Sequence, residues 1–158
     1  MDLYQELILD HSKNPQHAGL REPFEAEVHH VNTTCGDEVT LRVHLEDTTS
    51  GPQAVLADVS YDAIGCSISM ASASILAQEC RGHSLAETMD TYAAMKSMLT
   101  SRGKDPGDEE VIGDGVALAG GAQYPAPVKC ALRPWTALTD ALARAGADLS
   151  AMPAEETR

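Results

Sequence analysis

The chain has 158 residues, the size of one typical globular domain. It carries 24 acidic and 11 basic side chains, and the resulting formal charge of −13 argues against binding to nucleic acids or anionic membranes, which attract basic surfaces. No segment approaches the roughly twenty apolar residues that span a bilayer, and residues 1–19 lack the basic start and apolar run of a signal peptide, so we expect a cytoplasmic protein.

The first third of the chain predicts one short helix followed by strands. Apolar residues recur at helical spacing over residues 2–11, and Asn14-Pro15 ends that pattern. Apolar and polar residues then alternate, as is typical of strands that are buried on one face. Three strands are predicted in this way, over residues 26–31, 38–45 and 54–61.

The remainder of the chain predicts helices. Ser84 and Glu87 form the spacing of a capping box, which places a helix start at residue 84. Residues 101–108 have the composition of a loop. Helices are predicted over residues 66–79, 84–100 and 126–145, with a short helix over 111–118.

Strands followed by segregated helices predict an α+β fold. We expect a three-stranded antiparallel sheet with the helices packed on one of its faces. Residues 1–146 are expected to form one domain, and residues 147–158 a flexible C-terminal tail.

Three of the four cysteines lie where the predicted chain changes direction. Cys35 falls in the loop between the first two strands, Cys66 at a strand-to-helix junction, and Cys130 near the start of the last helix. Asp37 adds a carboxylate two residues after Cys35, and Gly36 between them lets the backbone bend so that both side chains point at one ion. Gly65 gives the same freedom beside Cys66.

Three thiolates and one carboxylate make a tetrahedral set that suits Zn²⁺, and also a soft site able to hold iron with sulfide. In the reducing cytoplasm such cysteines are metal ligands, nucleophiles or buried thiols rather than disulfides. The spacing alone leaves open the simpler interpretation that these are scattered, buried cysteines.

Several short motifs are distributed over residues 2–142. They are Leu3-Tyr4, Asp10-His11, Asn14-Pro15, Thr34-Cys35-Gly36-Asp37, Gly65-Cys66-Ser67-Ile68-Ser69, and Lys129-Cys130-Ala131-Leu132 with Trp135. With these motifs the chain resembles the IscU/NifU N-terminal superfamily, and more closely its SufU branch. The resemblance implies an IscU/SufU-like fold and one zinc ion held by Cys35, Asp37, Cys66 and Cys130.

The resemblance also implies a function in iron–sulfur cluster assembly. The chain would act as a zinc-dependent sulfurtransferase in which Cys35 accepts persulfide sulfur from a SufS-type cysteine desulfurase, with Suf scaffold proteins downstream. Two features favour the SufU branch: Lys129 stands where scaffold-type relatives carry His, and residues 101–121 form an insertion. A scaffold that holds an iron–sulfur cluster and a purely structural zinc domain remain the alternatives.

The other cysteine, the histidines and the methionines favour simpler roles. Cys80 follows Cys66 by 14 residues, about 21 Å along a helix, and is expected to be buried. His29 and His30 are adjacent in a strand and face opposite ways, so they cannot chelate one ion together. The sequence leaves open whether His11 forms a hydrogen bond at its helix end or contacts a partner. Core positions are expected for Met70, Met89, Met95 and Met98.

Overall fold

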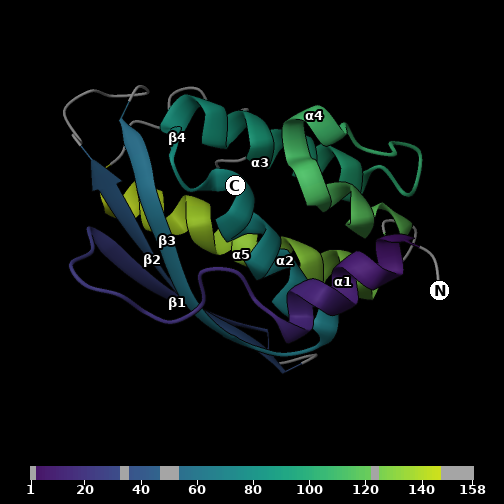
Figure 1. Cartoon of the computed structure of the whole chain (residues 1–158), viewed down its shortest axis with the longest axis horizontal. Coiled ribbons are helices and arrows are strands. Elements are labelled where there is room, and N and C mark those ends of the chain that lie inside the picture. Colours follow the sequence, from purple (N-terminus) through teal and green to yellow (C-terminus); the bar gives the residue numbers. More distant parts are fainter. Residues whose placement is uncertain (1–2, 33–35, 47–53, 122–124, 147–158) are drawn as a thin grey trace.

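The computed structural model describes residues 3–32, 36–46, 54–121 and 125–146 (Figure 1). The predicted tail, residues 147–158, lies outside these residues. The strands are β1 (Ala26–Asn32), β2 (Asp37–Glu46), β3 (Val55–Ile64) and β4 (His83–Ser84). The helices are α1 (Leu3–Lys13), α2 (Ser67–Cys80), α3 (Leu85–Thr100), α4 (Glu109–Ile112), the 3-10 helix η2 (Gly113–Gly121) and α5 (Pro125–Arg144).

The sheet is antiparallel throughout and has the order β1-β2-β3-β4. The α+β class is confirmed, but the prediction of three strands is wrong, because β4 adds a fourth. Gly82 donates its backbone N–H to the carbonyl of Leu56 at 2.7 Å, and Leu85 donates to Ala54 at 2.8 Å. A strand of two residues is too short to produce a readable alternation, which is why the sequence did not reveal it.

The alternation of β2 separates the two faces of the sheet. Val39, Leu41 and Val43 are buried, whereas the residues between them are only partly covered. The buried face packs against α2 and α5, which cross the sheet in Figure 1. Asp37 has the same parity as these valines and leucine, so its side chain faces the helices from the first position of β2.

The opposite face of the sheet is partly covered by the segment that connects α1 to β1. Arg21 in this segment donates Nε–H to Asp58 Oδ2 at 2.6 Å and a second N–H to Oδ1 at 2.9 Å. Arg81 donates to the same carboxylate at 3.1 Å. Burial alone would raise the pKa of Asp58, but the hydrogen bonds from both arginines outweigh it and lower this pKa to about 2.

The helices follow the predictions closely, with one exception. Ser84 is the N-cap of α3, and its side chain and that of Glu87 form the reciprocal capping box. Trp135 of α5 is fully buried and donates its indole N–H to Ser72 of α2 at 3.1 Å. The expected helix over residues 111–118 is instead a one-turn α4 followed by η2. Gly113, the C-cap of α4 and the first residue of η2, has a φ of +53°, which breaks the α-helical geometry.

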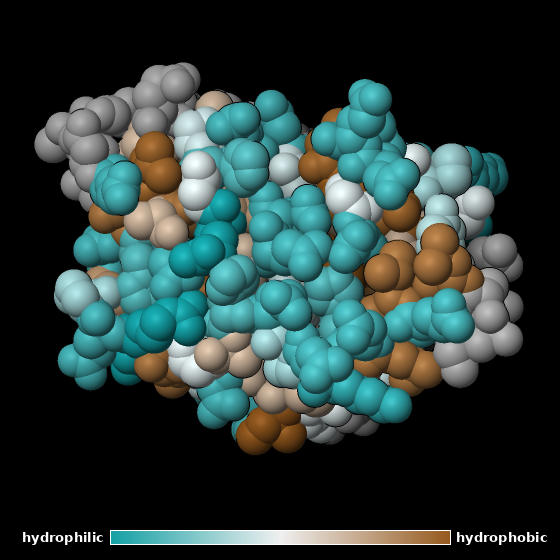
Figure 2. Space-filling view, in the orientation of Figure 1, coloured by the Kyte–Doolittle hydropathy of each residue, from teal (hydrophilic) through white to brown (hydrophobic). Residues whose placement is uncertain are grey.

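The surface in Figure 2 is largely hydrophilic, in keeping with the acidic composition. Hydrophobic colours gather mainly at the end of the molecule where α1 begins, and Leu3 there is 66% exposed. Within the described ranges, no helix combines the length and the apolar character needed to cross a bilayer.

Candidate metal centre

Three side chains from distant parts of the sequence meet at one end of the sheet. Asp37 begins β2, Cys66 is the N-cap of α2 directly after β3, and Cys130 lies near the start of α5. The register of the sheet brings the first two together, because Glu38 pairs with Ile64 and the chain then turns through Gly65 to Cys66. Packing of α5 on β2 and α2 adds Cys130 from above.

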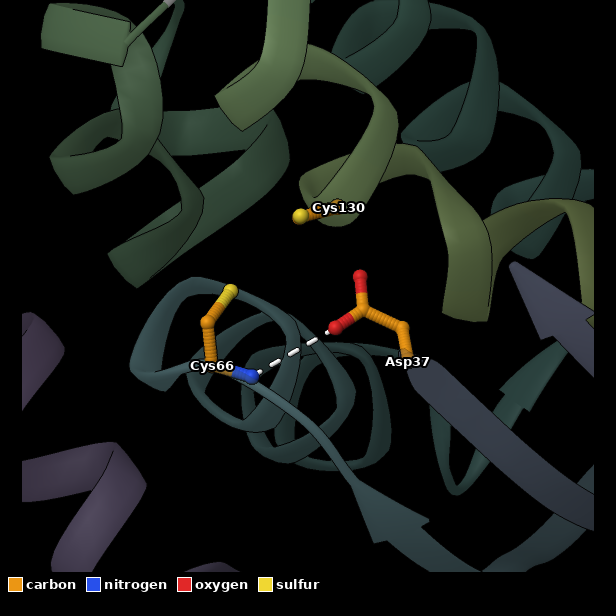
Figure 3. Close-up of side chains that lie close together, drawn as sticks. All are labelled: Asp37, Cys66 and Cys130. Atoms are coloured by element: carbon orange, nitrogen blue, oxygen red, sulfur yellow. Dashed lines mark hydrogen bonds between the residues drawn. The ribbon is translucent and has the colours of Figure 1, made fainter. Parts of the chain in front are cut away.

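Their ligand atoms point toward one another, as Figure 3 shows. The two sulfur atoms and a carboxylate oxygen of Asp37 all lie within 4.8 Å of one another. The backbone N–H of Cys66 also donates a hydrogen bond to Asp37 Oδ1 at 3.4 Å. Asp37 and Cys130 are buried, whereas Cys66 is exposed. The cluster is therefore open on the side of Cys66.

This arrangement fits a zinc ion. Zn–S and Zn–O bonds of about 2.3 and 2.1 Å place the ligands of a tetrahedral site roughly 3.4–3.8 Å apart. The observed separations, at most 4.8 Å, need to contract by only about 1 Å to reach these values. A buried carboxylate beside two thiols is also costly unless a cation compensates its charge. The set supplies three donors, and a tetrahedral site requires a fourth.

Cys35, the predicted fourth donor, lies outside the described residues. Its position in the sequence, two residues before Asp37, is the basis of that prediction.

Two glycines beside the cluster have different roles. Gly36 adopts a φ of +73°, a left-handed conformation that favours glycine, and so turns the chain into β2. Gly65 makes room for a neighbour, since a Cβ atom here would overlap Asp37 Oδ1 and lie 3.1 Å from Asp37 Cγ. The sequence suggested backbone freedom at both positions, but at Gly65 the tighter constraint is the contact with the carboxylate.

The remaining polar residues singled out in the sequence do not join the cluster. Cys80 is completely buried at the end of α2, and burial raises the pKa of its thiol. His30 contacts Asp140 Oδ2 at 2.8 Å, while His29 contacts Thr40 at 2.8 Å on the other side of the strand. Lys129 is exposed beside Cys130.

His11 is a buried residue of the core. It is 3% exposed, and its ring nitrogens lie 2.6 Å from Ser74 Oγ and 2.9 Å from Asp114 Oδ2. These contacts tie α1 to α2 and η2. The hydrogen-bonding role considered for this residue is therefore the one that the structure supports.

The sequence reasoning did not assign a role to Ser69, although this residue lies within one of the recognised motifs. Its hydroxyl oxygen is 3.7 Å from the sulfur of Cys66. The three-residue spacing at a helix start is the only signal in the sequence that could have indicated this contact.

Comparison with known proteins identifies relatives over most of the chain. Residues 3–131 match the family described as NifU-like N terminal domain. The chain is 34% identical over 143 residues to the zinc-dependent sulfurtransferase SufU of Bacillus subtilis, covering 90% of each chain. It is 33% identical over 142 residues to the iron-sulfur cluster assembly scaffold protein IscU of Streptococcus pyogenes, covering 90% of this chain and 84% of the relative.

Solved structures show the same architecture. One is the crystal structure described as an iron-sulfur cluster assembly scaffold protein for the SUF system from Fervidobacterium islandicum AW-1. It is 32% identical, has a TM-score of 0.74, and the match covers 87% of this chain and 94% of that one. The N-terminal part of a NifU-like protein from Brucella abortus has a TM-score of 0.78 at 22% identity, which supports the fold alone.

Proposed function

The chain belongs to the family of NifU-like N-terminal domains, and on this basis we propose that it is a zinc-dependent sulfurtransferase of iron–sulfur cluster assembly. It accepts persulfide sulfur from a cysteine desulfurase and passes this sulfur on. The observation that carries the proposal is the meeting of Asp37, Cys66 and Cys130 within 4.8 Å, with Cys35 two residues before Asp37 in the sequence.

The residues of the centre have separable tasks. Asp37 and Cys130 are buried and act as anchoring ligands, whereas the exposed Cys66 is the ligand on the solvent-facing side of the centre. Cys35 is the fourth ligand and the sulfur acceptor. When bound, zinc would hold these thiols as thiolates at neutral pH. In the proposed transfer Cys35 leaves the centre, while the ligands on β2, at the start of α2 and on α5 stay in place.

The proposed transfer is a thiol–persulfide exchange. The Cys35 thiolate attacks the outer sulfur of the desulfurase persulfide, so that a new S–S bond forms on Cys35 while the partner's S–S bond breaks. The partner cysteine leaves as a thiolate, and the proton of the persulfide stays with the transferred sulfur. No external oxidant or reductant is needed, because one S–S bond replaces another.

The finer features of the proposal come from the sequence. Lys129 replaces the histidine of scaffold-type relatives, which removes one nitrogen donor and leaves the Asp37 carboxylate as the oxygen ligand. We propose a SufS-type desulfurase as the partner, Suf scaffold proteins as the next acceptors, and the cytoplasm as the location. The similarity to the B. subtilis sulfurtransferase SufU supports this assignment.

A scaffold on which an iron–sulfur cluster is built is the second candidate function. It is favoured by the 33% identity to a scaffold protein named IscU, and by the thiolate-rich donor set, which also suits iron with sulfide. Elemental analysis separates the two candidates, since a sulfurtransferase of this type retains zinc after aerobic purification and a scaffold binds iron and sulfide on reconstitution.

The deciding experiment is a desulfurase turnover assay with cysteine as substrate. Wild-type protein should raise sulfide production, and Cys35→Ala should abolish both this stimulation and the persulfide adduct seen by mass spectrometry. Asp37→Ala should reduce the zinc content, whereas Cys80→Ala serves as the matched cysteine control and should behave like wild type. Full stimulation by Cys35→Ala would refute the proposal.

A further inference from the structure

One more polar side chain lies against the metal centre. Ser69 is 4% exposed, and its hydroxyl oxygen is 3.7 Å from the sulfur of Cys66, within hydrogen-bond distance for a sulfur atom. In the described part of the chain this hydroxyl has no second hydrogen bond. A buried hydroxyl needs a partner, and here the sulfur supplies it.

The geometry of the helix start explains why the pair meets. Cys66 is the N-cap of α2 and Ser69 is the third helical residue, the same spacing as Ser84 and Glu87 at the start of α3. In α3 the N-cap side chain accepts from the backbone, as a cap normally does. In α2 the side chain of Cys66 makes no capping bond, and its sulfur faces Asp37 and Cys130 instead. The serine at the third position approaches this sulfur from the helix side.

Metal binding would fix which of the two groups donates. Between a thiol and a hydroxyl, either atom can be the donor. A thiolate bound to a metal has no proton, so only the Ser69 hydroxyl can then donate. A hydrogen bond to an ionised acceptor is stronger than a neutral one, and the contact therefore gains strength when the centre is loaded.

We propose that Ser69 is a positioning residue of the metal centre, whose hydroxyl donates to the Cys66 thiolate and withdraws charge from its sulfur. The proposal rests on the ligand role assigned above to Cys66. Among the described cysteines, Cys66 is the exposed one, whereas Cys80 and Cys130 are buried. Cys66 is therefore the thiolate most accessible to an incoming persulfide. Reducing its nucleophilicity keeps it as a ligand and leaves sulfur acceptance to Cys35.

The test uses full-length protein loaded with Co²⁺, whose sulfur-to-metal charge-transfer band reports the charge on the thiolates. Removing the hydrogen bond in Ser69→Ala should shift this band to longer wavelength, because the sulfur electrons are held less tightly. Ser69→Thr retains the hydroxyl and should keep the wild-type band. Ser67→Ala removes an exposed serine from the first turn of the same helix and is the matched control.

Two further measurements use the zinc-loaded protein. Ser69→Ala should bind zinc roughly 10-fold more weakly in competition with a chelator, as is common when an outer-shell partner of a ligand is removed. Alkylation of Cys66, located by mass spectrometry, should be faster in Ser69→Ala than in wild type and unchanged in Ser67→Ala.

A charge-transfer band and a Cys66 alkylation rate in Ser69→Ala that equal those of Ser67→Ala would overturn the proposal. If Ser69→Ala does not fold, Ser69→Thr carries the test, since a shifted band in this variant contradicts the proposal and an unshifted band supports it. Neither readout involves sulfur transfer. A failure of the proposed sulfurtransferase function would therefore leave both readouts intact and remain distinguishable.

Discussion

Gly65→Ala is the substitution whose effect on the centre follows most directly from the structure. An added Cβ would overlap Asp37 Oδ1 and lie 3.1 Å from Cγ and 3.3 Å from Cα of the same residue. Carbon atoms in good contact are separated by about 3.5–4.0 Å. The carboxylate, which is 1% exposed and enclosed on its other sides, would have to move by roughly 1 Å to relieve the overlap.

The size of the effect follows from this displacement. Overpacking of a buried site costs about 1–3 kcal/mol of unfolding free energy. Metal–ligand distances tolerate deviations of about 0.2 Å, so a shift of roughly 1 Å removes the carboxylate as an effective ligand. We expect the zinc affinity of Gly65→Ala to fall by at least about 10-fold, which corresponds to about 1.4 kcal/mol. Chelator competition measures the affinity, and urea unfolding of the metal-free protein measures the stability.

Gly82→Ala is the matched control. Gly82 also has a positive φ, +85°, but a Cβ there has no atom within 4 Å, so only the backbone is strained. This control should lose about 1 kcal/mol of stability and keep the wild-type zinc affinity. Wild-type zinc affinity and stoichiometry in Gly65→Ala would show that the close approach of backbone and carboxylate does not organise the centre.

Two further predictions concern residues away from the centre. The pKa of Asp58 falls from 3.8 to about 2, which at about 1.36 kcal/mol per unit amounts to roughly 2 kcal/mol. Because this pKa is depressed, the stabilisation is present above pH 4 and is lost as the pH falls toward 2. Asp58→Asn should therefore lower the unfolding free energy at pH 7 by this amount and flatten the pH dependence of the unfolding free energy between pH 2 and 4. An unchanged urea midpoint in Asp58→Asn would contradict this prediction. Burial raises the pKa of Cys80, so its thiol should resist alkylation in the native protein while metal-free Cys66 reacts, and labelling of both at equal rates would contradict the assignment.

The secondary structure could be predicted where the pattern is long or the chemistry is local. The alternation around Val39, Leu41 and Val43 identifies a strand with one buried face, because side chains in a strand point to opposite sides in turn. Ser84 and Glu87 mark the start of α3 because a capping box involves only four consecutive residues. β4 was missed because its two residues are held by pairing with a distant strand, which no local pattern encodes.

Asp37, Cys66 and Cys130 could be named from the sequence as candidate ligands, and the predicted junctions placed them near changes of chain direction. The distances between these side chains in space could not be obtained from the sequence. It depends on the register that sets Glu38 opposite Ile64, and a slip by one residue would turn Asp37 to the other face of the sheet. It also depends on the packing of α5, which places Cys130 over the strand ends.

Residue types and their local spacing determine the chemistry available to this protein, which is that of thiols and a carboxylate in an acidic chain. They also determine the capping box and the order of strands and helices. Whether those groups meet depends on long-range pairing and helix packing, as does the approach of the Ser69 hydroxyl to a cysteine sulfur. Local spacing governs only the interactions between near neighbours along the chain. Distances between remote residues arise when sheet register and core packing together reach the lowest free energy.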